Sequence, residues 1–154
     1  VTGVQTCALP ILKISTKGRY ALRLMLDLAL HGNGEYISIK EISGRQGISD
    51  KYLEQIVTVL NRAGFVKSVR GPHGGYRLTK TSSEYTVGMI LRQMEGNLAP
   101  VSCIEGGENT CEHAAHCVTV EVWKKIDEAV SGVVDRITLT DLVQWSCEKA
   151  AGKE

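Results

Sequence analysis

Three cysteines lie close together in the second half of the chain, where they could bind a metal or undergo redox chemistry. Seven residues separate Cys103 from Cys111, and five separate Cys111 from Cys117. Thiolates favour soft metals and iron–sulfur clusters, so a flexible loop that carries three of them could wrap such a group. The spacing is not a zinc-finger pattern, because it contains no close Cys-x-x-Cys pair. Cys147 is expected to be an ordinary residue of a C-terminal helix.

The segment that carries the three cysteines shows little periodicity, and we predict a loop over residues 97–117. Four interpretations of its thiols remain open: an iron–sulfur cluster, a metal-free oxidation sensor, a mononuclear metal site, and inert small residues. We favour the cluster, because a cysteine that is only a small hydrophobe prefers a buried position. We expect a cytosolic location, since no export signal is found, and clustered cysteines there indicate metal or redox chemistry more often than disulfides.

Residues 1–11 differ from the rest of the chain. They have neither the basic region nor the apolar length of a signal peptide. They resemble the in-frame translation of a sequencing adapter, so we expect the native chain to begin near Leu12 and leave Cys7 out of the argument.

Length and composition indicate one soluble domain with a small appendage. The 154 residues are 43% hydrophobic and 23% charged, which excludes a disordered or collagen-like chain. No apolar run approaches the roughly 20 residues of a membrane helix, so no membrane partner is expected. The net charge of +1 conceals an asymmetry: residues 12–80 carry 12 Lys and Arg against 5 Asp and Glu, whereas residues 81–154 carry 6 against 12. A basic front half indicates a polyanionic partner.

The front half predicts a DNA-binding fold. Helices are expected over 15–31, 38–46 and 49–64, because each begins at a serine suited to an N-cap and ends at glycine or polar turn residues. The short turn between the second and third helices is typical of a helix-turn-helix. Two β-favouring segments, 65–70 and 76–79, then flank a Gly/Pro turn and predict a hairpin. The expected fold class is therefore mainly α with a small β-hairpin wing: a winged helix-turn-helix domain over 12–80, followed by a long dimerisation helix.

In this fold the third helix would enter the major groove of double-stranded DNA. Gln55 suits adenine, Glu54 could accept from a cytosine amine, and Lys51 suits a phosphate or guanine. Arg70 and His73 at the tip of the hairpin would reach an adjacent minor groove. Contacts to phosphates are expected from Lys13, Lys17, Arg19 and Arg45.

Three motifs in this order carry a resemblance to a known family. They are KISTKGRYAL at 13–22, YLEQ at 52–55 and SVRGPHGGY at 68–76. With them, residues 12–146 resemble the Rrf-type winged-helix regulators, whose best known members are the IscR-like iron–sulfur regulators. The resemblance implies a homodimeric bacterial transcription factor. It also implies a DNA-reading surface formed by Tyr52, Glu54, Gln55 and Arg70.

The IscR-like branch carries three cysteines at this place, which implies an iron–sulfur cluster on Cys103, Cys111 and Cys117. Its type is not assigned, with [2Fe-2S] favoured. The chain departs from the pattern in two respects: the first interval is longer than the expected five residues, and Val120 stands where a histidine is expected. The fourth ligand therefore stays open among His113, His116, Glu121 and an exogenous group, with His116 the weaker loop candidate because it directly precedes Cys117.

The remaining elements complete the expected domain plan. A connecting helix capped by Thr86 and the cysteine loop form segment 81–117, and a dimerisation helix and a final helix form segment 118–154. The long helix predicted over 118–134 has a broad apolar stripe, which either packs against a second subunit or belongs to an ordinary core. A dimer would make the operator pseudo-palindromic. The stripe consists of Val122, Trp123, Ile126, Val130, Val133 and Val134.

We therefore predict a DNA-binding transcriptional regulator that senses iron–sulfur status, oxygen or redox state through three cysteines. The alternative is a metal-free repressor of the same fold that is controlled by thiol oxidation or by a partner protein. An enzyme is not expected, because the sequence offers no Ser-His-Asp set, no phosphate-binding loop before a helix and no paired carboxylates in a credible pocket.

Overall fold

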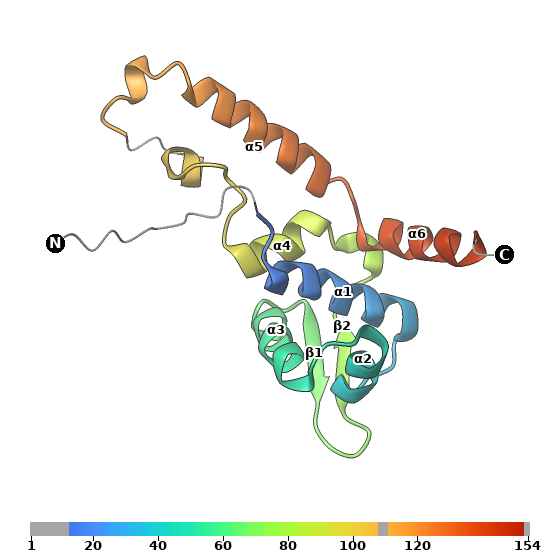
Figure 1. Ribbon diagram of the computed structural model, residues 1–154. Coiled ribbons are helices and arrows are strands. Elements are labelled where there is room, and N and C mark those ends of the chain that lie inside the picture. Colours follow the sequence, from blue (N-terminus) through green and yellow to red (C-terminus); the bar gives the residue numbers. More distant parts are fainter. Residues whose placement is uncertain (1–12, 108–110, 153–154) are drawn as a thin grey trace.

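The computed structural model describes residues 13–107 and 111–152 of the chain (Figure 1). Within them it contains six α-helices, a two-stranded antiparallel sheet and three short 3-10 helices, which confirms the predicted fold class. The tail 1–11 lies outside the described residues. The elements are α1 (Thr16–His31), α2 (Ile39–Gln46), α3 (Asp50–Arg62), β1 (Val66–Val69), β2 (Gly75–Leu78), η1 (Ser82–Glu84), α4 (Val87–Glu95), η2 (Ser102–Gly107), η3 (Ala114–His116), α5 (Val120–Val134) and α6 (Leu139–Ala151).

The helices of the front half begin where the sequence predicts. The hydroxyls of Ser15, Ser38 and Ser49 each accept a hydrogen bond from the backbone N–H three residues further on. At Ser38 the bond is reciprocal, because Glu41 accepts from the Ser38 backbone in a capping box. Gly47 ends α2 with φ 64°, a left-handed conformation that favours glycine, and thereby turns the chain into α3.

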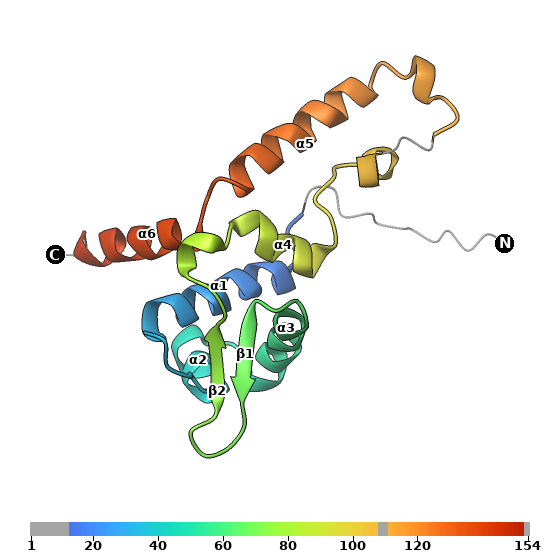
Figure 2. The same cartoon turned by 180° about the vertical axis from the view of Figure 1, so that it is seen from behind.

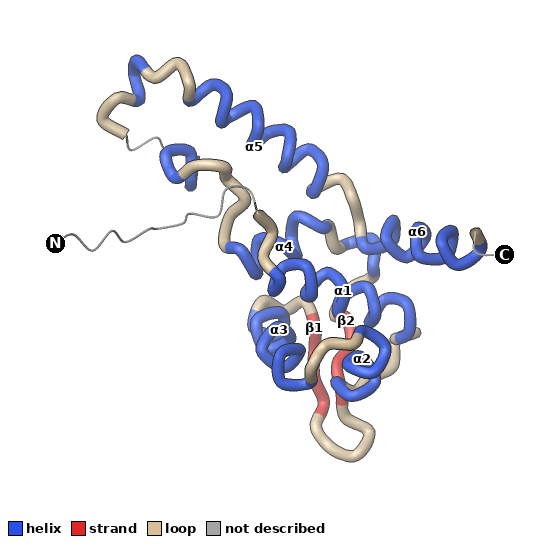
Figure 3. The backbone as a smooth tube through the Cα atoms, in the orientation of Figure 1, coloured by secondary structure: helices blue, strands red, loops and turns tan. Residues whose placement is uncertain are grey.

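The core is built around α1. This helix lies between α4 on one side and α2, α3 and the hairpin on the other (Figures 1 and 3), and it also contacts α6. Burial of its apolar face and those of its neighbours is the main stabilising contribution, since apolar area removed from water is worth about 25 cal/mol per Å². The buried core comprises Ala21, Leu24, Met25, Leu28, Ile37, Ile42, Ile48, Leu53, Ile56, Val57, Leu60, Val66, Tyr85, Ile90 and Leu139.

The hairpin is the predicted wing, and its base is fixed to the rest of the fold. Val66 of β1 lies opposite Leu78 of β2. Ile37 adds a bridge to the hairpin, with its N–H donating to Tyr76 O at 2.9 Å and its carbonyl accepting from Tyr76 N at 2.8 Å. A side chain at Gly75 would overlap the backbone of Ile37, so this close approach requires glycine.

In the back half of the chain, α5 lies apart from the core, whereas α6 packs against it. α5 extends away from the body of the molecule and leads to the cysteine loop at its far end (Figure 2). α6 then returns to pack on α1, with Leu139 fully buried in the core. The loop predicted over 97–117 contains two short 3-10 helices, η2 and η3, whose few residues give no periodicity that a sequence pattern could reveal.

Candidate nucleic-acid interface and cysteine loop

The recognition helix α3 has one buried face and one exposed face. Leu53, Ile56 and the other apolar residues of its buried face hold it against the core. Lys51, Glu54 and Gln55 are exposed on the opposite side. These three side chains are therefore free to contact a ligand while the helix itself stays fixed.

Tyr52 occupies an intermediate position between core and surface. It is half-buried, and its ring lies edge-on to Tyr20 of α1 with 5.7 Å between centroids. The guanidinium carbon of Arg23 lies 5.5 Å from the Tyr20 ring centroid. This stack joins the first turn of α3 to α1, so Tyr52 helps to fix the position of α3 and its exposed residues.

A polar network that the sequence reasoning missed joins α1 to α2. Asp27 is a fully buried carboxylate, and it accepts from Arg45 Nη2 at 2.7 Å, Arg45 Nε at 3.0 Å and Gln46 Nε2 at 2.9 Å. Arg23 continues the network by donating to the side chain of Gln46 at 3.0 Å. The hydrogen bond to Asp27 raises the pKa of Arg45. Arg45, which is predicted to contact a phosphate, thus also has a structural partner, and the sequence signal for this pair is an acidic residue within the apolar face of α1.

The predicted wing and α1 cations lie on the surface. Arg70 and His73 are exposed at the hairpin tip, which extends beyond α2 and α3 (Figure 1). Arg19 is exposed and donates to the Thr16 hydroxyl at 3.0 Å, and Lys17 is half-buried. The exposed face of α3, the wing tip and the start of α1 thus provide the basic positions predicted for DNA.

The three cysteines lie on separate pieces of the loop. Cys103 is in η2 and half-buried, Cys111 is exposed, and Cys117 is half-buried just before α5. Among residues 13–107 and 111–152, no three His, Cys, Asp or Glu side chains are close enough together to hold a metal ion. The donor types suit an iron–sulfur cluster, and binding one would require these pieces to move together.

Cys117 has a polar environment of its own. Its Sγ lies 3.2 Å from the Thr119 hydroxyl oxygen. Hydrogen bonds from the Thr119 hydroxyl, which contributes most, and from the Val120 backbone lower the pKa of the Cys117 thiol. The residues at the start of α5 therefore increase the fraction of thiolate at this position, and a thiolate is both the metal ligand and the reactive form.

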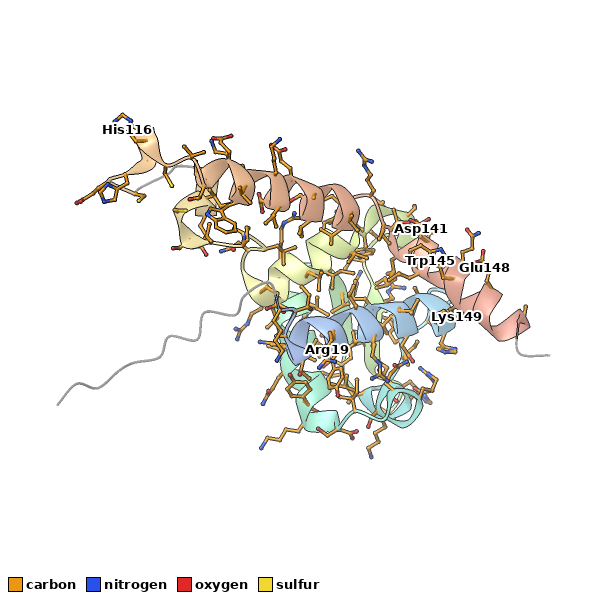
Figure 4. The ribbon with its side chains drawn as sticks, turned by 45° about the horizontal axis from the view of Figure 1, so that its top comes forward. Arg19, His116, Asp141, Trp145, Glu148 and Lys149 are labelled. Carbon is orange, nitrogen blue, oxygen red and sulfur yellow. The ribbon has the colours of Figure 1, made fainter. Side chains whose placement is uncertain are left out.

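The candidates for a fourth ligand differ in their availability. His113 and His116 are exposed, and Figure 4 places His116 at the outer end of the loop, far from Arg19 on α1. Glu121 accepts a hydrogen bond from Lys124 at 3.1 Å. Val120, which replaces the expected histidine, is buried.

The loop is attached to the DNA-binding body by a contact that the sequence did not reveal. Glu95, the last residue of α4, accepts from the Ser15 hydroxyl at 2.6 Å and from the Ser15 N–H at 3.1 Å. Gly18 makes room for it, because a side chain there would overlap the Glu95 carboxylate. A pocket of about 190 Å³ lies beside this contact, lined among others by Lys13, Pro100 and Val130. The end of α4, from which the loop departs, is therefore tied to the start of α1.

Comparison with known proteins assigns the chain to a family. The family model Rrf2, described as an iron-dependent transcriptional regulator, matches residues 14–145. The chain belongs to the Rrf2 family. Among similar proteins, Protein rrf2 of Nitratidesulfovibrio vulgaris is 40% identical over 134 residues, which cover 86% of this chain and 88% of that protein. The HTH-type transcriptional regulator IscR of Serratia proteamaculans is 40% identical over 132 residues, covering 86% and 79%.

Solved structures of Rrf2-type regulators have the same architecture. CymR (YrzC), the global cysteine regulator of B. subtilis, is 41% identical with a TM-score of 0.71, and the match covers 86% of this chain and 97% of that one. IscR of T. potens is 40% identical with a TM-score of 0.69, covering 87% and 88%. These matches confirm the resemblance drawn from the three motifs, and this Rrf2-family protein is a DNA-binding transcriptional regulator rather than an enzyme.

No helix in the described part of this Rrf2-family protein is both long and apolar enough to span a membrane.

Proposed function

We propose that the protein is a cytoplasmic, homodimeric regulator that binds a pseudo-palindromic operator and senses iron–sulfur status, oxygen or redox state through Cys103, Cys111 and Cys117. The observation that carries the sensing part is the placement of the cysteine loop between two fixed elements. At one end the loop follows Glu95 of α4, which accepts hydrogen bonds from Ser15 before α1, and at the other end Cys117 lies three residues before the first residue of α5. A change in the loop would therefore act on the DNA-binding body and on the dimerisation helix together.

The DNA complex follows from the exposed surface. The N-terminal part of α3 enters the major groove, where Gln55 meets adenine, Glu54 a cytosine amine and Lys51 a guanine or phosphate. Arg70 and His73 of the wing reach the neighbouring minor groove, whose negative potential attracts cations. Phosphate contacts fix the register. They come from Lys17 and Arg19 at the start of α1, and Tyr52 supports the reading surface from its place beside Tyr20.

The dimer interface is the exposed side of α5. Val122 is 49% exposed and Val133 is 58% exposed, and with Ile126 and Ala129 they follow the alternating four- and three-residue spacing of a coiled-coil seam. The other side of the apolar stripe is used within the chain, since Val130 lines the pocket beside the loop. A second copy of the same helix is complementary to the exposed seam, because a two-fold interface pairs identical surfaces.

The sensing step is a linkage between ligand binding and DNA affinity. A bound iron–sulfur cluster would supply a redox-active group held by the thiolates of Cys103, Cys111 and Cys117. Because the described structure keeps these residues on separate pieces of loop, gathering them repositions η2, which contacts α5. The two recognition helices are spaced through α5, so the position of the loop biases operator affinity or choice.

A metal-free mechanism is the second candidate. The hydrogen bond from Thr119 lowers the pKa of the Cys117 thiol, which increases the fraction of thiolate, the form that oxidants attack. The similarity to CymR, the global cysteine regulator by its description, is as strong as the similarity to IscR. In this mechanism no cluster is bound, and oxidation of a thiol or contact with a partner protein changes the conformation of the loop.

One preparation separates the two mechanisms. The chain from residue 12 onward is purified without oxygen, and its visible absorption, iron and acid-labile sulfide are measured alongside operator binding. A cluster regulator gives a brown protein whose colour is lost in Cys103→Ala, Cys111→Ala and Cys117→Ala but kept in the matched control Cys147→Ala. A colourless, iron-free protein that binds DNA and responds to reversible thiol oxidation supports the metal-free mechanism instead.

A further inference from the structure

The long helix α5 has few contacts with the rest of the described chain. Its principal contacts are with η2 and with α4, and Val120 is its only buried residue. The helix has 15 residues, which corresponds to a length of about 22 Å. Its direction relative to the DNA-binding body therefore depends on few contacts, and those at its C-terminal end lie closest to the body (Figures 1 and 2).

Two backbone hydrogen bonds fix the position of the chain where α5 ends. The Val87 N–H donates to the Ile137 carbonyl at 2.9 Å, and the Leu139 N–H donates to the Tyr85 carbonyl at 2.9 Å. They flank the isolated bridge between Thr86 and Thr138. This bridge fixes one point of the chain after α5, and the contacts of α5 with α4 bear on the angle of the helix.

An arginine fork supplies one such contact. Arg92 of α4 donates through Nη1 and Nη2 to the two carboxylate oxygens of Asp135, at 2.5 and 3.0 Å, and through Nη2 to the Ser131 hydroxyl at 3.3 Å. Gly88 permits the approach, because a side chain at this position would overlap the Asp135 carboxylate. A bidentate pair fixes orientation as well as distance.

The exposure of the pair indicates that its main role is geometric. The side chains of Arg92 and Asp135 are 34% and 42% exposed. Ion pairs this accessible to water contribute little to folding stability. This contact is bidentate, includes Ser131 one turn away and requires a glycine at position 88. Such a contact adds little stability but is suited to setting the angle between two helices.

We propose that the Arg92–Asp135 pair sets the angle between α5 and the DNA-binding body, and thereby selects the half-site spacing of the operator. The inference rests on the proposed homodimer through α5, since only a dimer presents two recognition helices at a defined separation. Arg92 and Asp135 are then specificity-determining residues that do not touch DNA. A rotation of about 10° at the base displaces the far end of a 22 Å helix by about 4 Å, close to the roughly 3.4 Å rise of one base pair.

The test is selection from a randomised duplex library by the full chain, followed by sequencing of the bound duplexes. The wild-type protein should select two inverted half-sites at one narrow centre-to-centre spacing. Arg92→Ala and Asp135→Asn should select the same half-site sequence with a spacing that is shifted or broadened by at least one base pair. Lys124→Ala is the matched control, because it removes an ion pair within α5 that does not reach α4, and its spacing should equal that of the wild type.

The possible results test the role of the Arg92–Asp135 pair separately from the proposed dimeric regulator. Selection of no duplex, or of single half-sites, by the wild-type protein would refute the dimeric regulator itself. A normal wild-type result with unchanged spacing in both variants would overturn the role of the pair. Asp135→Asn preserves the shape of the side chain, so it serves as the test should Arg92→Ala fail to fold. Dimer mass and melting temperature, measured for each variant, separate a spacing effect from a loss of assembly.

Discussion

In the proposed complex with DNA, the polar side chains of the DNA-binding body have two different physical tasks. Gln55 and Glu54 on α3 and Arg70 on the wing are placed to reach base edges or a groove, whereas Lys17 at the start of α1 is placed to meet a phosphate. Base contacts carry sequence information and phosphate contacts do not. The two tasks can therefore be separated by comparing specific with random DNA.

Arg70→Ala is expected to weaken operator binding by about 1–3 kcal/mol and to relax sequence preference near the wing. Lys17→Ala should weaken binding to all duplexes alike and reduce the slope of affinity against salt by about one. Fluorescence anisotropy over a salt series, on the selected operator and on a random duplex, measures both effects. Equal losses on the two duplexes for Arg70→Ala would contradict its role in reading sequence.

The Cys117 environment makes a prediction about pH. Because hydrogen bonds from the Thr119 hydroxyl and the Val120 backbone lower the pKa of this thiol, its thiolate persists to lower pH than it would without them. In metal-free protein, alkylation of Cys117 by iodoacetamide should reach half its maximal rate at a lower pH than in Thr119→Val. Mass spectrometry of the Cys117 peptide follows the reaction, and superimposable pH profiles for the two proteins would argue against the hydrogen bond.

The sequence predicts those features of the helices that depend on interactions between residues close together in the chain. The serine caps at Ser15, Ser38 and Ser49 and the glycine stop at Gly47 act within one turn of a helix, so the helix starts and the turn into α3 could be predicted. The exposed face of α3 followed from the same periodicity. The positions of the three thiols in space could not follow, because spacing along a loop does not fix distances across it.

Contacts between elements were the part that the sequence concealed. Asp27 and Arg45 meet across two helices, and the buried Tyr85 hydroxyl donates to the Phe65 carbonyl at 2.7 Å while it accepts from the Thr79 N–H at 3.1 Å. The sequence around each of these polar residues does not indicate which residue it binds. Their pairing is decided by how helices and strands pack, which periodicity alone does not specify.

The Asp27–Arg45 link predicts a large effect from a residue at the surface of α2. Arg45→Ala leaves the buried Asp27 carboxylate without its ion-pair partner, with Gln46 still donating to it, and should lower the free energy of unfolding by about 1–3 kcal/mol. Urea denaturation measures the change in the free energy of unfolding. Lys40→Ala, at an exposed cation of the same helix, is the control and should change stability by less than about 0.5 kcal/mol. Similar values for the two variants would show that Asp27 does not depend on Arg45.

The charge of the protein is divided unevenly along the chain. The basic excess of residues 12–80 falls on the segment that contains α3 and the wing, and the acidic excess of residues 81–154 falls on the segment that contains α4, the cysteine loop, α5 and α6. An acidic back half is repelled by phosphates, which leaves the basic face as the one that meets DNA. The exposed seam of α5 is then free to bind a second copy without competing with DNA.

Because the seam of α5 is exposed in the single chain, a substitution there should weaken the dimer without destabilising the fold. Val133 is 58% exposed in the single chain, so Val133→Glu buries no charge in the monomer. In a dimer, the same substitution places two carboxylates in the apolar seam. The dimer dissociation constant should rise at least tenfold, which corresponds to about 1.4 kcal/mol, as measured by sedimentation equilibrium. Affinity for the full operator should fall while affinity for an isolated half-site is retained, because each recognition helix remains intact. Lys124→Glu introduces the same side chain on the opposite face of α5 and should leave the dimer unchanged, so equal dissociation in both variants would mean that added charge, rather than the seam, is responsible.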